Sequence, residues 1–117
     1  MADTAHKALK MIIAIVQRGK ADALVGTAIK AGAPAATVLF GRGQGMRERL
    51  GPLGIAIQPE KEIILVILEE WLSEQVLTAM TKEGNLDKPG VGFAFEVPVE
   101  KAVAFVEAHE LTSTPGR

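Results

Sequence analysis

Hydrophobic residues follow two different spacings along the chain, and these spacings predict strands and helices in alternation. Residues 9–16 are apolar on both alternations, which is typical of a strand buried on both faces. Residues 20–31 instead carry apolar side chains at a helical spacing, and Gly32 with Pro34 marks the end of that helix. A second strand is predicted at residues 35–40, where β-branched residues gather.

The second half of the chain repeats this order after a long connection from Gly41 to about Glu60. The elements predicted there are a strand at 62–68, a helix at 71–83, a strand at 93–97 and a short terminal helix at 98–108. The resulting order, βαββαβ, indicates an α+β, ferredoxin-like sandwich in which one antiparallel sheet carries two helices on one face.

The sheet face that carries no helix is also expected to be apolar, because residues 9–16 and 63–68 have no polar alternation. Such a face would be a large exposed apolar patch in water. We therefore expect it to pack against other copies of the chain in an oligomer. Phe93 and Phe95 point the same way on their strand, so core packing is expected for both. Trp71 is expected to pack against the sheet or a neighbouring subunit.

The composition limits the class of protein. A chain of 117 residues is one domain by default, and we expect a domain at residues 9–108 between a flexible lead at 1–8 and a flexible tail at 109–117.

The net charge of −1 argues against nucleic-acid binding, which needs a cationic surplus. The absence of cysteine excludes disulfides and thiolate metal sites, and His6 and His109 are too few to form a metal site. With no membrane-spanning or signal-like segment, a cytoplasmic protein is expected.

Two glycine-rich segments hold the candidate chemistry. One closes an apolar run at residues 40–45, and the other precedes an apolar run at residues 88–95. Backbone amides in such segments, together with a nearby guanidinium or ammonium group, can hold an anion such as a nucleotide phosphate. Taken alone, each segment is only a weak indication, because glycine runs beside strands are more often plain turns than binding sites. The candidate binding residues are Gly41, Arg42, Gly43 and Gln44 in the first segment and Lys88, Gly90, Val91, Gly92 and Phe93 in the second.

Four short motifs, in this order and spacing, carry a resemblance to a known family. They are Phe40-Gly41-Arg42-Gly43, Pro59-Glu60-Lys61-Glu62, Pro89-Gly90-Val91-Gly92 and the segment Val97-Pro98-Val99-Glu100-Lys101-Ala102-Val103. Over about residues 9–105 the sequence resembles the PII signal-transduction proteins, in particular their divergent PII-like branch. The resemblance implies a homotrimeric regulator, and not an enzyme, with adenine nucleotide sites in the clefts between subunits.

The same resemblance assigns roles to the two segments. A B-loop at about residues 85–93 is expected to cradle phosphates, and a T-loop at about residues 43–59 is expected to reach a protein partner such as a membrane transporter or an associated enzyme. The T-loop residues expected to contact that partner are Met46, Arg47, Arg49, Leu50 and Leu53.

The chain departs from the classical family pattern at several positions. Gly43 stands where the classical proteins have a glutamine, and Lys61 is shifted by one position, so no classical 2-oxoglutarate site is expected. The chain contains no tyrosine, which excludes uridylylation. Phe93 replaces a B-loop cation, and residues 104–111 contain no arginine. Because these cations would bind the triphosphate in the family that the sequence resembles, their loss favours ADP, AMP or cyclic AMP over ATP with magnesium.

Two alternatives on the same fold remain open. Gln17-Arg18-Gly19 could imitate the phosphate loop of an acylphosphatase-like enzyme, although no suitably placed asparagine follows the second strand. A CutA-type metal-binding trimer is the other alternative, against which the shortage of histidine and the absence of cysteine speak.

Overall fold

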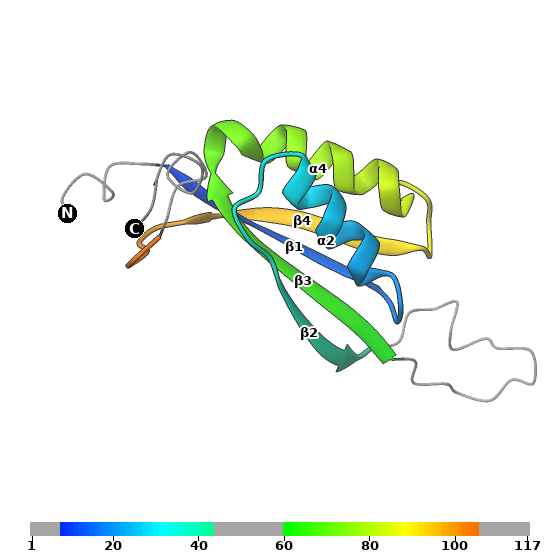
Figure 1. Ribbon diagram of the computed structural model, residues 1–117. Coiled ribbons are helices and arrows are strands. Elements are labelled where there is room, and N and C mark those ends of the chain that lie inside the picture. Colours follow the sequence, from blue (N-terminus) through cyan, green and yellow to red (C-terminus); the bar gives the residue numbers. More distant parts are fainter. Residues whose placement is uncertain (1–7, 44–59, 106–117) are drawn as a thin grey trace, which may run out of the picture.

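The computed structural model describes residues 8–43 and 60–105, and its elements follow the predicted order (Figure 1). They are β1 (Leu9–Gln17), α2 (Ala21–Lys30), β2 (Thr37–Arg42), β3 (Glu60–Glu69), α4 (Glu70–Gly84) and β4 (Gly92–Val99). The α+β, ferredoxin-like βαββαβ prediction is confirmed. The predicted lead at 1–8, except residue 8, and the tail at 109–117 lie outside the described residues.

The four strands form one antiparallel sheet in the order β2-β3-β1-β4, so β2 and β4 are its two edges. β2 begins and ends two residues later than predicted, because its ladder with β3 continues to the pair Arg42 and Glu60. On the other side of the sheet, β4 begins at Gly92, which pairs with Val16 of β1. The end of β2 and the start of β4 therefore lie at the same end of the sheet.

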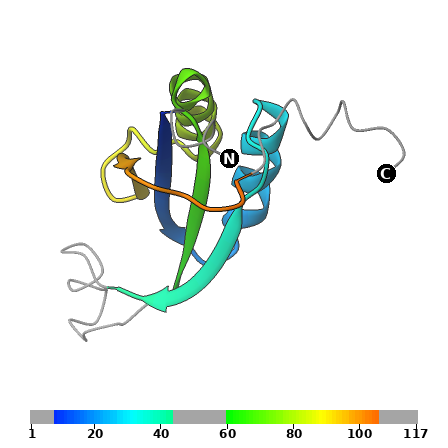
Figure 2. The same ribbon diagram turned by 90° about the vertical axis from the view of Figure 1, so that its left-hand side faces the viewer.

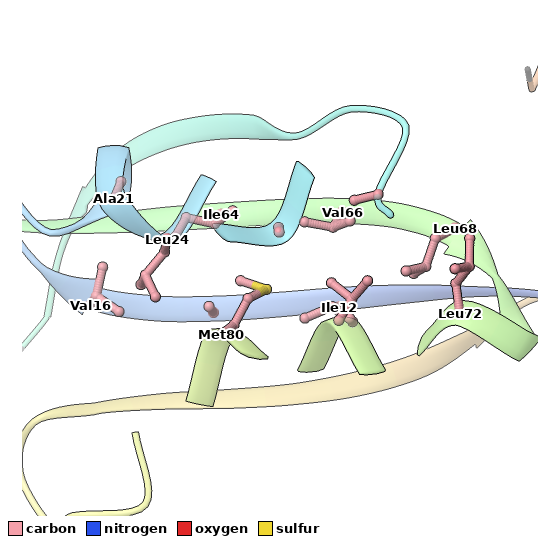
Figure 3. Packing of buried hydrophobic residues seen from close by; sticks show 13 residues of the cluster. Ile12, Val16, Ala21, Leu24, Ile64, Val66, Leu68, Leu72 and Met80 are labelled. Atoms are coloured by element: carbon pink, nitrogen blue, oxygen red, sulfur yellow. The ribbon is translucent and has the colours of Figure 1, made fainter. Parts of the chain in front are cut away.

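The core lies between one face of the sheet and the two helices (Figure 3). Alternate residues of β1 and β3 face the helices, as the period of two along a strand requires. The residues with the most complete burial in this layer are Ile12, Ala14, Ile64, Val66 and Leu68 from the strands and Ala21, Leu24, Ala28, Val76 and Met80 from the helices. The apolar side chains predicted at helical spacing form the helix side of this core, except for Ile29 of α2, which is half exposed.

Local residues mark the C-terminal ends of both helices, and a side chain from the sheet caps the start of α2. Gly32 follows α2 at a φ of 123°, and Asn85 ends α4 in the left-handed region at a φ of 52°. At the start of α2, Lys20 makes no side-chain cap. Instead the Ala21 amide donates a hydrogen bond of 2.8 Å to Glu62 Oε1 on β3. A strand carboxylate thus satisfies one of the free amides at this helix start.

The opposite face of the sheet carries no helix (Figure 2). The strand register places apolar side chains on it. We call it the helix-free face, made up of Met11, Ile13, Ile15, Leu39, Ile63, Leu65, Ile67, Phe93, Phe95 and Val97. Phe93 and Phe95 were expected to pack in the core, and within a single chain this prediction is wrong. Both rings lie on the helix-free face, and Phe93 is 58% exposed. Their ring centroids are 5.4 Å apart.

Trp71 does not pack against the sheet, contrary to one of its two expected positions. It lies in the first turn of α4 and is largely exposed, and its indole N–H donates to Glu69 Oε1 at 3.1 Å. The other expected position, against a neighbouring subunit, stays a prediction.

The short helix predicted at residues 98–108 is wrong over its described part. Pro98 and Val99 belong to β4, and residues 100–105 form no helix. Proline is tolerated there because β4 is an edge strand, where a missing backbone donor does not interrupt the sheet. Ala104 adopts a φ of 65°, which a helix does not allow. Residues 106–108 lie outside the described part of the chain.

Within residues 8–43 and 60–105, neither helix has the length and the apolar content that crossing a membrane requires.

Candidate functional site

The first candidate segment forms the far end of the β2–β3 ladder, which extends beyond the two helices (Figure 1). Phe40 and Arg42 lie on the same face as Val38, which packs against the core, so both are on the helix side of the sheet. No helix covers them, and Phe40 is 77% exposed. A cavity of about 420 Å³ opens beside them. We call it the β2–β3 pocket, lined by Arg18, Phe40, Gly41, Arg42 and Glu60.

An ion pair ties the β1–α2 turn to this pocket. Arg18 Nη1 lies 2.5 Å from Glu60 Oε1, and Glu60 is the first residue of β3 after the predicted T-loop. Two residues further along β3, the Glu62 carboxylate accepts a hydrogen bond from the first amide of α2. The turn between β1 and α2 is therefore joined twice to the beginning of β3.

The second candidate segment, the predicted B-loop, is a series of tight turns between α4 and β4. The Lys88 amide donates to the Asn85 carbonyl at 3.0 Å, and the Val91 amide donates to the Lys88 carbonyl at 3.3 Å. Gly90 has a φ of 82°, a conformation that favours glycine. A phosphate would have to displace this second hydrogen bond to reach the Val91 amide.

Close packing explains the glycine at the start of β4. A Cβ atom on Gly92 would lie 2.7 Å from Leu86 Cδ2 and 3.1 Å from the Ile15 carbonyl oxygen. The backbone contact cannot be relieved by rotating a side chain. Gly92 thus has a structural role in seating the B-loop against β1, whether or not its amide contacts a ligand.

A hollow of about 480 Å³ lies on the helix side, between the β1–α2 turn and the end of α4. Gln17, Gly19 and Lys20 line it from the turn, and Asn85 and Val91 line it from the B-loop. The turn that holds Arg18 thus separates the β2–β3 pocket from the B-loop.

The structure places the two candidate segments at one end of the sheet but on its opposite edges. Arg42 closes β2, and Gly92 opens β4. Three strand spacings separate the two edges, which amounts to about 14 Å. A single chain therefore does not bring the Arg42 guanidinium and the B-loop amides around one phosphate group.

Several of the predicted site residues belong to the parts of the chain outside residues 8–43 and 60–105. Gln44 lies outside the described residues, as do most of the predicted T-loop and the expected partner contacts Met46, Arg47, Arg49, Leu50 and Leu53. His6 and His109 lie outside them as well. Among the residues that are described, no group of three His, Cys, Asp or Glu side chains could hold a metal ion.

Sequence reasoning missed three residues of the pocket. Arg18 belongs to the phosphate-loop motif of the enzyme alternative, and Phe40 and Glu60 belong to two of the family motifs, but none of the three is a predicted binding residue. One signal could have found them: antiparallel pairing puts the end of β1, the end of β2 and the start of β3 at the same end of the sheet. The pairing of β1 with β3, which a sequence does not display, is the missing step.

Comparison with protein families gives a match over most of the chain. The family described as nitrogen regulatory protein P-II matches residues 9–109. Among curated proteins, none matches the sequence. The family match spans all six elements, the β2–β3 pocket and the B-loop. The chain therefore belongs to the PII nitrogen regulatory protein family.

Proposed function

We propose that this protein is a cytoplasmic, trimeric regulator that binds an adenine nucleotide between its subunits and passes the signal to a partner protein through its T-loop. Proteins of the family are regulatory signalling proteins that generally bind adenine nucleotides. They are typically trimers that interact with partner proteins. The proposal extends these family properties to particular residues of this chain.

The observation that carries the proposal is the position of the two candidate segments. Arg42 and the B-loop lie on opposite edges of one sheet, at the same end. If copies associate so that the β2 edge of one meets the β4 edge of the next, Arg42 of one copy approaches Gly90 and Gly92 of its neighbour. A phosphate would then accept hydrogen bonds from a guanidinium and from backbone amides.

The helix-free face supports association into an oligomer. Half-buried aliphatic side chains fill its centre, and Leu39, Ile67, Phe93 and Phe95 are exposed in the single chain. A contiguous apolar patch of this kind is typical of an interface between proteins. Its burial in a trimer would set the relative position of the subunits, and hence the shape of the nucleotide cleft.

The cations of the two segments limit the nucleotide. Lys88 is the cation of the B-loop, and Phe93 stands at a position where a second cation was expected. A site with few cations is better suited to ADP, AMP or cyclic AMP than to ATP with magnesium, because each missing cation removes a charge-assisted contact.

Signalling is assigned to the T-loop, at about residues 43–59. Its expected contacts combine apolar anchors with two arginines, and such residues are frequent in the energetic centres of interfaces. A membrane transporter or an enzyme associated with one is the proposed partner. Deleting residues 44–53 should leave the described fold intact and abolish that interaction.

Identifying the nucleotide is the first test. The purified protein is denatured and the released small molecules are separated and identified, and calorimetry then measures ATP, ADP, AMP and cyclic AMP with and without magnesium, bicarbonate or 2-oxoglutarate. Saturable binding of one adenine nucleotide per subunit supports the proposal. No binding of any of the four nucleotides contradicts it, and turnover of an acyl phosphate would favour an enzyme.

A further inference from the structure

Arg18 is a charged residue of the β2–β3 pocket to which the proposed function gives no role. We propose that Arg18 is a second cation of the anion site at the base of the T-loop, and that Glu60 occupies this cation until a phosphate displaces the carboxylate. The inference rests on the proposed function, since it assumes that the pocket of Arg42 is an anion site.

The geometry puts two guanidinium groups on one cavity. Arg18 reaches the pocket from the turn after β1, and Arg42 reaches it from the last residue of β2. Arg42 is paired with Glu60 in the ladder, and Arg18 contacts the Glu60 carboxylate at 2.5 Å. Glu60 therefore lies between the two arginines, at the position where an anionic ligand would be attracted to both.

The local charge favours an added anion. The pocket lining contains two arginines and one carboxylate. The nearby carboxylate of Glu62 is directed to the amide of Ala21. The lining of the pocket thus carries one net positive charge, although the whole chain is slightly acidic.

The ion pair is weak enough to be exchanged. The side chains of Arg18 and Glu60 are 72% and 56% exposed, and ion pairs this exposed add little to stability. A phosphate offers more acceptor oxygens and more charge than one carboxylate, and guanidinium groups bind it through paired hydrogen bonds.

The exposed ring of Phe40 indicates what else the ligand could carry. It lines the same cavity as both arginines and has no helix over it. An aromatic ring beside a phosphate site can stack on a nucleobase or on a guanidinium plane. The chemical class that fits the pocket is a phosphate ester, and a nucleotide belongs to this class.

The test compares Arg18→Gln with Glu60→Gln in the full chain, by calorimetry with inorganic pyrophosphate at constant ionic strength. Arg18→Gln removes a cation, so we expect its dissociation constant to rise about tenfold. Glu60→Gln removes the competing carboxylate, so we expect its dissociation constant to fall about threefold. Both variants lose the same ion pair, so their thermal unfolding should change by the same small amount.

The opposite direction of the two affinity changes distinguishes a ligand-binding arginine from a purely structural ion pair. Equal changes in both variants, or no change in either, overturn the inference. ADP is then titrated into the wild-type protein and into both variants. If ADP binds equally to all three, the inference fails and the proposed function stands. If pyrophosphate shows the opposite changes while ADP does not bind, the inference stands and the proposed nucleotide function fails.

Discussion

Replacing Phe93 by serine tests whether the helix-free face is an interface between subunits. The ring is 58% exposed in the single chain. A phenylalanine side chain offers about 200 Å², so about 120 Å² of this ring remains to be buried by a neighbour. At about 25 cal/mol per Å², covering that area stabilises the assembly by about 3 kcal/mol per subunit. The loss corresponds to about a hundredfold weaker association per subunit.

Light scattering coupled to size-exclusion chromatography measures the effect over a range of protein concentrations. Wild-type protein should elute at the mass of a trimer at micromolar concentration, and Phe93→Ser should dissociate as it is diluted. Ile29→Ser is the matched control, because Ile29 is a half-exposed apolar residue on the helix layer, away from the helix-free face. This control should remain trimeric.

Two results would refute the reasoning. A wild-type protein that is monomeric at micromolar concentration would mean that no copy covers the helix-free face. A wild-type trimer whose stability responds equally to Phe93→Ser and Ile29→Ser would mean that the trimer forms through another surface.

Three further predictions test other parts of the account. Gly92→Ala should destabilise the fold by about 1–3 kcal/mol in urea unfolding, because the added Cβ would meet backbone. The control Gly26→Ala, which has open space around it, should stabilise α2 by about 0.5–1 kcal/mol. Equal effects of the two substitutions would contradict the packing at Gly92. Glu62→Ala should lower the free energy of unfolding by about 1 kcal/mol through loss of its bond to the Ala21 amide, and an unchanged value would show that water replaces this cap. Lys88→Ala should weaken nucleotide binding by about 1–3 kcal/mol in calorimetry, and unchanged affinity would remove Lys88 from the site.

The fold could be predicted from the sequence because its signals are local. Gly32 follows the first helix as predicted, and α4 ends one residue beyond the predicted position 83. The doubly apolar pattern of residues 9–16 identifies a central strand. The helix predicted at 98–108 is wrong at its start, because Pro98 belongs to an edge strand, where a proline is tolerated. Edge and central strands are defined by pairing, which depends on residues far apart in the chain.

The candidate site was predictable only in part, for a related reason. Arg42 and Gly90 belong to motifs and can be recognised in one stretch of sequence. Arg18 and Glu60 meet across 42 positions, and neither stands in a glycine-rich motif that would attract attention. The exposure of Phe93 also could not be read from the sequence, since a strand buried in an oligomer has the same apolar pattern as one buried in a chain.

The central claim is that one nucleotide lies between Arg42 of one subunit and the B-loop of the next. Two variants each remove one half of this site: Arg42→Ala removes the guanidinium, and Gly90→Val places a β-branched residue at a φ of 82°. Neither variant alone should bind ADP at concentrations that saturate the wild type. The two proteins are then unfolded together and refolded, so that mixed trimers form.

Native mass spectrometry separates the mixed trimers by mass and counts the bound ADP in each. The account predicts one ADP in every mixed trimer, because one cleft then joins an intact Arg42 to an intact B-loop from a different subunit. Mixed trimers that bind no ADP, like the two parent variants, would show that both halves of the site come from the same chain and would contradict the account.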